Sequence, residues 1–304
     1  MKIKQENLNI FYGYRCNYAC EGCFSGSDVV NDEKLDPSLE EILQSIPILA
    51  KTVEVESMIT LIGGEPFLYW DDRILVISQA LNTWFPEKRI NIFTNGQLLN
   101  KHFDKVLYLA DHVVDNLSIT ITNHVSECGN ELPVTLWRKN IQQLLTHPRL
   151  VKISNEHYHI KDNINASIYF SIMTEFKPYY KKNIDGSIKP FSTNDPTGSM
   201  THGCPGNVCS TAFGTKFYKC PTLATLPNHL KSINQYHDPD WQKYVSYSAI
   251  DLLNIDQELL TAFSNTYGKP ISECDMCNNN PANTITKRPY NMIFKQQLHP
   301  TFND

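Results

Sequence analysis

The feature that most constrains this chain is a group of three cysteines near its N-terminus. Cys16, Cys20 and Cys23 have C-x3-C-x2-C spacing and follow an apolar and aromatic run at residues 8–14. Three thiolates on one loop can hold three corners of an iron–sulfur cube. The next cysteine, Cys128, is more than a hundred residues away, so one iron would stay open for another ligand. A zinc site is the alternative, but zinc requires four ligands and no nearby Cys or His completes the set.

The apolar pattern predicts alternating strands and helices at intervals of about 30 residues, which is typical of parallel βαβ units. We expect an α/β protein with a partial (β/α)6 barrel at residues 1–175. Residues 176–304 carry five cysteines and are expected to form a smaller α+β unit. The expected strands are 7–14, 53–62, 89–94, 116–122, 150–154 and 166–173. The expected helices are 72–84, 98–109, 134–146 and one that opens at Asp36-Pro37-Ser38 with Pro37 in its first turn.

Two short motifs follow the second and third predicted strands. Gly63-Gly64-Glu65-Pro66 comes directly after residue 62, and Thr94-Asn95-Gly96 closes the third strand. Glycines allow a close backbone approach, and Glu65 supplies a negative acceptor for an ammonium group. The carboxyl ends of parallel strands meet at one mouth, where α/β barrels carry their sites. Taken alone, each motif also fits an ordinary turn.

The three motifs, in this order and spacing, resemble the signature of the radical S-adenosylmethionine (radical SAM) superfamily. The resemblance implies that Cys16, Cys20 and Cys23 hold a [4Fe–4S] cluster whose open iron is chelated by S-adenosylmethionine (SAM). It also implies that the motif at residues 63–66 binds the methionyl amino group of SAM. In the implied reaction, an electron from a flavodoxin- or ferredoxin-type donor cleaves SAM reductively. The resulting 5′-deoxyadenosyl radical then removes hydrogen from a substrate.

The contacts to adenosine depart from the family pattern at one position. The family usually has an aromatic residue just before the third cysteine, where this chain has Gly22. Tyr18 and Phe24 flank the loop and are the candidates to cover the adenine. The resemblance places polar ribose contacts at the fourth strand, at Ser118, Thr120 and Asn123. Hydroxyl groups on a half-buried strand face explain these residues equally well.

A second group of cysteines resembles the SPASM and Twitch extensions of radical SAM enzymes, which bind auxiliary [4Fe–4S] clusters. These extensions begin C-x9–15-G-x4-C, and this chain has one extra residue between Gly214 and Cys220. Residues 211–222 predict a β-hairpin that turns at Gly214 and returns Cys220 to the side of Cys204.

The number of cysteines favours a single auxiliary cluster. Full SPASM units have seven cysteines for two clusters, whereas this segment has five. The expected ligands are Cys204, Cys220, Cys274 and Cys277, and Cys209 is either surplus or replaces Cys204. A structural zinc site is the alternative, because C-x4-C and C-x2-C pairs also suit a zinc ribbon.

Composition excludes several classes of function. The net charge of −5 gives no global basic field for nucleic acid. The N-terminus lacks the features of a signal peptide, and no apolar run reaches the length of a membrane span, so we expect a cytoplasmic protein. Nine cysteines in a chain without an export signal indicate metal ligands rather than a disulfide framework.

The substrate is less constrained. Family members with such extensions often modify peptides or proteins, which makes this the first hypothesis. Only fifteen residues precede Cys16, with no evident peptide-recognition domain, so a small molecule, sugar or nucleotide is the alternative. Cys128 is a candidate hydrogen donor, although an ordinary loop cysteine explains it as well. A non-catalytic iron–sulfur or zinc scaffold is the hypothesis from another class.

Overall fold

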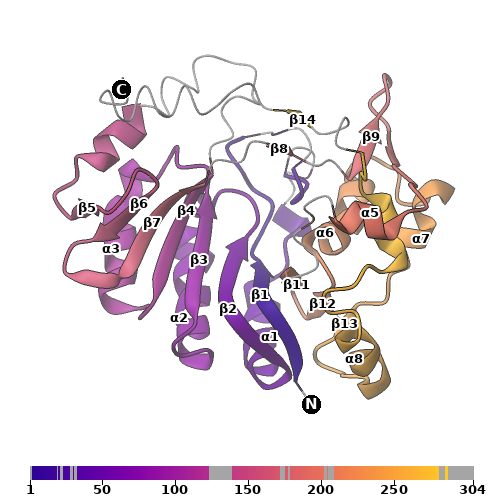
Figure 1. The fold of residues 1–304 in the computed structure, drawn as a ribbon, viewed down its shortest axis with the longest axis horizontal. Coiled ribbons are helices and arrows are strands. Elements are labelled where there is room, and N and C mark those ends of the chain that lie inside the picture. The colour runs from indigo at the N-terminus through magenta and orange to yellow at the C-terminus, as the bar shows by residue number, and fades with distance from the viewer. Residues whose placement is uncertain are drawn as a thin grey trace. The chain divides into compact units, whose positions relative to one another are not determined.

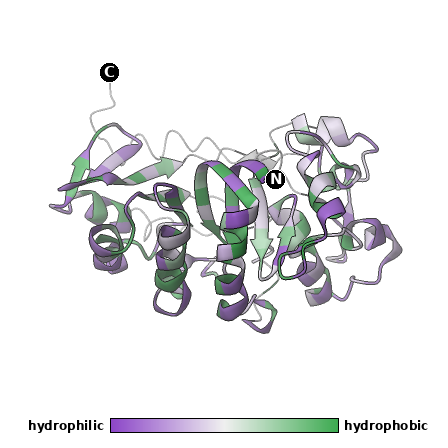
Figure 2. Ribbon diagram, turned by 90° about the horizontal axis from the view of Figure 1, so that it is seen from below, coloured by the Kyte–Doolittle hydropathy of each residue, from purple (hydrophilic) through white to green (hydrophobic). Residues whose placement is uncertain are grey.

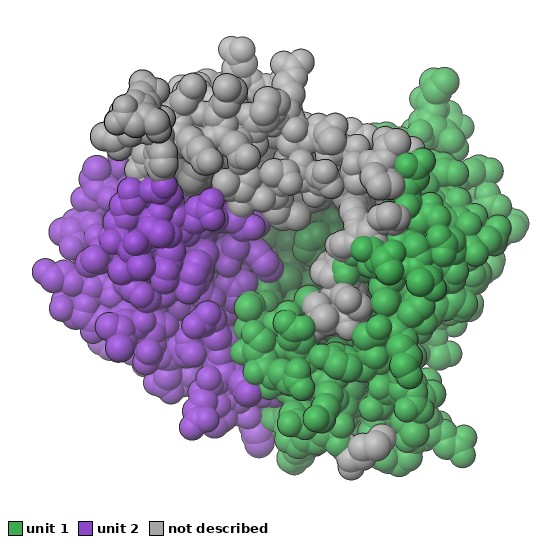
Figure 3. Space-filling model, in the orientation of Figure 1, with its two compact units in different colours: residues 1–64, 177–285 green, residues 65–176, 286–304 purple. Residues whose placement is uncertain are grey.

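A computed structural model describes most of the chain, in two compact units. The described residues are 2–18, 20, 23–27, 30, 33–122, 139–171, 175–176, 179–201, 204, 209–280 and 285–286. Unit 1 contains residues 1–64 and 177–285, and unit 2 contains residues 65–176 and 286–304 (Figure 3). The expected boundary at residue 175 lies beside the second division. The first 64 residues, however, group with the C-terminal segment rather than with residues 65–176.

Unit 1 is built around the strand β1 (Ile3–Phe11), which has a parallel neighbour on each side (Figure 1). One neighbour is β2 (Val53–Ile62), and the other is β11 (Cys209–Phe213), which arrives two hundred residues later. Next to β11 lies the antiparallel strand β12 (Lys216–Tyr218), and then β13 (Ile250–Asp251). The expected hairpin at residues 211–222 is confirmed, and Gly214 forms its turn with a left-handed φ of 56°.

Helix α1 (Leu39–Thr52) connects β1 to β2 and begins at a capping box. The Ser38 hydroxyl accepts the Glu41 N–H at 3.1 Å, and the Glu41 carboxylate accepts the Ser38 N–H at 2.8 Å. Pro37 therefore precedes the helix instead of lying in its first turn, because Ser38 is the N-cap. The remaining elements of unit 1 are β9 (Tyr180–Lys182), β10 (Ile188–Pro190), α5 (Pro196–Thr201), α6 (Pro221–Ser232), α7 (Gln242–Val245) and α8 (Gln257–Ser264).

Unit 2 contains a second run of strands in the order β3-β4-β7-β6-β5. Parallel pairs join β3 (Arg89–Thr94) to β4 (Leu117–Thr122) and β4 to β7 (Asn163–Ser171). The sequence predicted one short strand near 150–154, whereas β5 (Leu150–Lys152) and β6 (His157–Ile160) form an antiparallel addition to β7. The helices are α2 (Leu75–Trp84), α3 (Phe103–His112) and a segment at 139–145, and a short strand is β8 (Glu175–Phe176). Strand β14 (Ile285–Thr286) falls at the division between the two units in the sequence.

Both units thus have the parallel strands and intervening helices that the alternating pattern predicted, which confirms the α/β class. The helices carry hydrophilic residues on their outer sides and hydrophobic residues on the sides that face the strands (Figure 2). The remaining described elements are short helices. Three-residue 3-10 helices lie at Glu33–Leu35, Pro66–Leu68, Asn100–His102 and Pro239–Trp241, a longer 3-10 helix lies at Ser272–Met276, and a π-helix lies at Trp70–Ile74.

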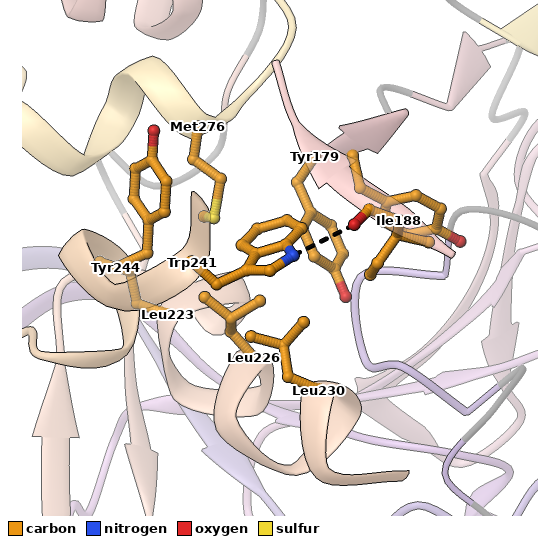
Figure 4. Close-up of a cluster of buried hydrophobic side chains, with 9 residues drawn as sticks. Tyr179, Ile188, Leu223, Leu226, Leu230, Trp241, Tyr244 and Met276 are labelled. Carbon is orange, nitrogen blue, oxygen red and sulfur yellow. Dashed lines mark hydrogen bonds between the residues drawn. The ribbon is translucent and has the colours of Figure 1, made fainter. Parts of the chain in front are cut away.

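A cluster of buried side chains around Trp241 supports the C-terminal part of unit 1. The indole is fully buried, and its Nε1–H donates to the Ile188 carbonyl at 3.2 Å (Figure 4). Three leucines from α6 pack beneath it, at Leu223, Leu226 and Leu230. Met276, between Cys274 and Cys277 in the sequence, belongs to the same cluster, and Cys220 and Cys277 pack against it. The cluster therefore holds the segments that carry the C-terminal cysteines.

We expect Trp241→Ala to lower the free energy of unfolding by about 3–5 kcal/mol, because the substitution opens a cavity in a packed core. Trp84→Ala is the matched control. The Trp84 side chain is 44% exposed, so we expect its loss to cost about 1 kcal/mol or less. Urea unfolding of both variants measures the difference, and equal costs would contradict this role of the Trp241 cluster.

Candidate functional site

The three N-terminal cysteines lie on a short loop that begins just after β1. Cys20 is buried, and Cys16 and Cys23 are half-buried. The Cys23 N–H donates to the Cys20 carbonyl at 3.2 Å, and the Gly26 N–H donates to the Cys23 carbonyl at 2.9 Å. The Tyr18 N–H donates to the Cys16 sulfur at 3.4 Å. A hydrogen bond therefore links Cys23 back to Cys20, and a second one links Gly26 back to Cys23.

Gly63 and Gly64 bring the end of β2 against the residues that lead into Cys16. The Gly64 N–H donates to the Gly13 carbonyl at 2.8 Å, and the Tyr12 hydroxyl donates to the Gly64 carbonyl at 2.7 Å. A Cβ atom at Gly64 would lie 2.0 Å from the Arg15 carbonyl oxygen, and one at Gly63 would lie 2.5 Å from the Gly13 carbonyl oxygen. The two glycines are thus required by the close contact of two backbone segments.

Glu65, the next residue of the motif, is a buried carboxylate in unit 2. Its side chain is 1% exposed and accepts hydrogen bonds from the Thr94 hydroxyl at 2.8 Å and the Asn95 N–H at 3.0 Å. The Phe67 N–H also donates to it, at 3.4 Å. Burial raises the pKa of Glu65 to about 7, although all three hydrogen bonds lower it. A carboxylate has about four acceptor sites, so one remains available for a further donor.

The Thr94-Asn95-Gly96 motif is the turn that positions these donors. The Thr94 hydroxyl accepts the Gly96 N–H at 3.0 Å while it donates to Glu65, and Gly96 has a left-handed φ of 77°. The Asn95 side chain accepts the Gln97 N–H at 3.0 Å. The motif at residues 63–66 and the motif at residues 94–96 therefore meet at the Glu65 carboxylate. The hydrogen bond from Thr94 fixes the orientation of this carboxylate.

Two of the expected ribose contacts, Ser118 and Thr120 on β4, are hydrogen-bonded to a residue of the neighbouring strand β3. Ser118 and Thr120 both donate to the Asn91 side-chain oxygen at 2.8 Å. Asn91 lies on β3, is nearly fully buried and was not singled out from the sequence, although an amide inside the apolar run RINIFT is unusual enough to reveal it. Each hydroxyl still has lone pairs to accept another bond. Asn123, the third expected contact, lies outside the described residues.

The two aromatic candidates for the adenine differ in their surroundings. Phe24 packs against a buried cluster that contains Phe11, Tyr14, Val30 and Ile62. Tyr18 is 8% exposed and lies on the cysteine loop itself. The neighbouring Gly22 and the candidate hydrogen donor Cys128 lie outside the described residues.

Helix α6 contacts both flanks of the N-terminal cysteine loop. The Thr225 hydroxyl donates to the Phe24 carbonyl at 3.0 Å, directly after Cys23 in the sequence. The Asn228 side chain donates to the Tyr14 hydroxyl at 3.2 Å and to the Leu35 carbonyl at 3.0 Å. The N-cap of the same helix is Cys220. One helix therefore links the N-terminal loop to the second cysteine group.

Four of the five C-terminal cysteines line one cavity in unit 1. They are Cys204, Cys220, Cys274 and Cys277. Cys220 is the N-cap of α6, and Cys274 and Cys277 flank the short helix at Ser272–Met276. The Cys277 N–H donates to the Cys274 carbonyl at 3.1 Å, which closes that turn. The cavity thus contains the four residues that the sequence favoured as ligands.

Cys209 is placed differently from the other four. It is the first residue of β11, paired in register with Asn7 of β1, and the Asn7 amide points at its sulfur at 3.8 Å. It does not line the cavity. Burial raises the pKa of its thiol to about 11, although the Asn7 contact lowers it. Cys209 is thus held by strand pairing, and the neighbouring Cys204 also raises the pKa of its thiol.

Charged residues border the cysteine cavity. Burial raises the pKa values of Cys220, Cys274 and Cys277 because little water is present to solvate a thiolate. Lys219 and Glu273 also line the cavity. Burial lowers the pKa of Lys219, whereas the neighbouring Cys274, Cys220 and Cys204 raise it. A negative group in the cavity and the Lys219 ammonium group would therefore stabilise each other.

A match to one family model covers all three N-terminal motifs. Residues 10–132 match the family model of the radical SAM superfamily. Among solved structures, the chain is similar to BtrN in complex with AdoMet and 2-DOIA, with 12% identity, a TM-score of 0.45 and coverage of 91% of this chain and 94% of that one. It is also similar to Streptococcus suis SuiB bound to the precursor peptide SuiA, with 13% identity, a TM-score of 0.27 and coverage of 90% and 76%. Both likenesses are distant, and no curated protein matches.

Residues 10–132 of this chain therefore correspond to a radical SAM domain. Enzymes of this family use a [4Fe–4S] cluster together with SAM. Within the described part of the chain, no helix combines the length and apolar character needed to cross a bilayer.

We expect Gly64→Ala to lower the free energy of unfolding by at least about 2 kcal/mol, because its Cβ would overlap the Arg15 carbonyl oxygen. Gly268→Ala is the control. Its φ of 65° is also left-handed, but no atom lies within 4 Å, so the backbone strain alone costs about 1–2 kcal/mol. A Gly64→Ala protein as stable as the control would argue against the close contact.

The pH dependence of stability tests the buried state of Glu65. Its pKa is about 7 in the folded protein and near 4.3 in the unfolded chain, so the folded state holds an extra proton between these values. Stability should fall as pH rises from about 4.5 to 7, by on the order of 3 kcal/mol, and then level off. In Glu65→Gln this contribution disappears. Chemical unfolding of both proteins at several pH values measures it, and identical pH profiles would refute the buried carboxylate.

Proposed function

We propose that the protein cleaves SAM reductively at the N-terminal cysteine loop and uses the radical to modify a peptide or protein. An auxiliary [4Fe–4S] cluster at the second cysteine group assists the reaction. The observation that carries the proposal is the buried carboxylate of Glu65, which keeps one acceptor site open within the motif expected to bind the amino group of SAM.

A cation is the group that Glu65 requires. A fully buried carboxylate is costly to ionise in the absence of a positive partner, and its raised pKa expresses that cost. An ammonium group at the remaining acceptor site would favour the ionised form. Thr94 and the Asn95 N–H hold the carboxylate in one orientation, so its position is fixed before a ligand arrives.

The donor sets fit the expected metal groups. Bound at Cys16, Cys20 and Cys23, an iron–sulfur cluster with an open iron supplies the electron that cleaves SAM. The turns at Cys20, Cys23 and Gly26 hold these three cysteines on one loop. At the second group, Cys204, Cys220, Cys274 and Cys277 provide the four thiolates that a complete cubane requires.

Zinc is the alternative at the second group, because four cysteines also suit a structural zinc site. We favour an iron–sulfur cluster because the same chain carries the N-terminal cysteine loop that is expected to hold one.

The proposed substrate class rests on the resemblance to enzymes with SPASM and Twitch extensions. A small molecule, sugar or nucleotide is the alternative substrate, and a flavodoxin- or ferredoxin-type protein is the proposed electron donor. A scaffold without catalytic function would have no use for a buried carboxylate with an open acceptor site beside Thr94.

Anaerobic reconstitution with iron and sulfide, followed by dithionite and SAM, tests the proposal. We expect about eight irons per chain and release of 5′-deoxyadenosine. Addition of deuterated peptide and small-molecule pools then identifies the substrate class, because deuterium appears in 5′-deoxyadenosine only with the pool that contains the substrate. No 5′-deoxyadenosine at full iron loading would overturn the proposal. Four irons and one zinc would overturn only the auxiliary cluster.

Cys209 provides a matched control for the auxiliary ligands. Cys277→Ala should reduce the iron content to about four per chain, whereas Cys209→Ala should keep about eight, because Cys209 lies outside the cavity. Equal iron loss in both variants would show that Cys209 is a ligand after all.

A further inference from the structure

Lys219 is a buried cation at the wall of the cysteine cavity. Its side chain is 4% exposed and lines the same cavity as Cys204, Cys220, Cys274 and Cys277. Its Nζ donates to the Thr266 carbonyl at 2.5 Å. Buried lysines are rare because an ammonium group loses its hydration, so the position requires an explanation.

Carboxylates do not supply that explanation. Among the described residues, none lies within ion-pair distance of Lys219, although other lysines of unit 1 have such partners. Lys216, three residues earlier, pairs with Asp251 at 2.9 Å, and Lys243 pairs with Asp275 at 2.7 Å. The Thr266 carbonyl offers a dipole but no full negative charge. Glu273 lines the same cavity but is not within ion-pair distance of Lys219, so the cysteines of the cavity are the remaining groups that can carry compensating charge.

We propose that Lys219 is the counter-cation of the auxiliary site and raises the reduction potential of the cluster held there. The inference rests on the proposed auxiliary cluster. Four thiolates outweigh the positive charge of a [4Fe–4S] core, so the assembled unit is an anion and becomes more negative when it gains an electron. In a cavity of low dielectric constant, a fixed ammonium group stabilises the reduced form more than the oxidised form.

The position of Lys219 suits this role. It immediately precedes Cys220 in the sequence, on the connection from β12 to α6, so its backbone is fixed beside a ligand. The hydrogen bond to Thr266, at the end of α8, keeps the ammonium group from swinging out to water. Burial protects the interaction from screening by salt, unlike the exposed pair of Lys216 and Asp251.

The test is a redox titration followed by electron paramagnetic resonance, in the full chain with Cys16, Cys20 and Cys23 replaced by alanine. This background leaves only the auxiliary cluster, with about four irons. We expect Lys219→Met to lower the ratio of reduced to oxidised cluster about tenfold at a fixed potential, which is a shift of about 59 mV to a more negative midpoint. Lys219→Arg, which keeps the charge, should stay close to the parent.

Two controls separate charge from packing. Lys216→Met removes the same charge at an exposed position and should leave the midpoint unchanged. Lys219→Gln removes the charge but keeps a donor for the Thr266 carbonyl, so it should shift the midpoint as Lys219→Met does. If both neutral variants fail to load iron while Lys219→Arg loads it, the charge is required for assembly and the inference is supported.

Other outcomes overturn the inference and distinguish it from the proposed function. An unchanged midpoint in fully loaded Lys219→Met contradicts the role of Lys219 and leaves the auxiliary cluster intact. Loss of iron in all three Lys219 variants means that the residue serves packing alone. Zinc in place of iron in the parent overturns the auxiliary cluster itself, and the inference falls with it.

Discussion

Helix α6 is the element on which the arrangement of unit 1 depends. Its N-cap is Cys220, and its leucines pack in the Trp241 cluster. Its polar side chains Thr225 and Asn228 donate to the Phe24 and Leu35 carbonyls on either side of the N-terminal cysteine loop. The Thr225 hydroxyl is fully buried and lies within hydrogen-bond distance of the Phe24 and Pro221 carbonyls, so it tolerates little movement. The second cysteine group is thereby fixed relative to the first.

Local chemistry made much of this structure predictable. The strands at 53–62 and 89–94 match β2 and β3, because runs rich in β-branched and apolar residues that end at glycine-containing turns leave little choice of boundary. The four cavity cysteines were chosen from spacing, and the structure gathers them. The pairing of β1 with β11 and the grouping of residues 1–64 with the C-terminal segment depend on contacts two hundred residues apart, which no local pattern encodes. Asn91 and Lys219 were missed because their hydrogen-bond partners, Ser118, Thr120 and Thr266, come from other elements of the fold.

The two buried charges, one in each unit, follow a common principle. Glu65 is held by three donors and Lys219 by one carbonyl, and in both cases the neutral hydrogen bonds fall short of a full counter-charge. Such groups reduce the stability of the unliganded protein. They also define the sign of what must bind, a cation beside Glu65 and an anion beside Lys219. Glu65 and Lys219 thus lower the stability of the unliganded protein and, for the same reason, select ligands of opposite charge.

The parallel pairing of β1 with β11 has a consequence for how the protein matures. During synthesis, the edge of β1 that receives β11 stays uncovered until more than two hundred residues have followed it. Closing so long a loop is slow, and an open strand edge is prone to aggregate in the meantime. Helix α6, which contacts the first cysteine loop, arrives later still. Assembly around the first cysteine loop therefore waits for β11 and α6, which are synthesised about two hundred residues later.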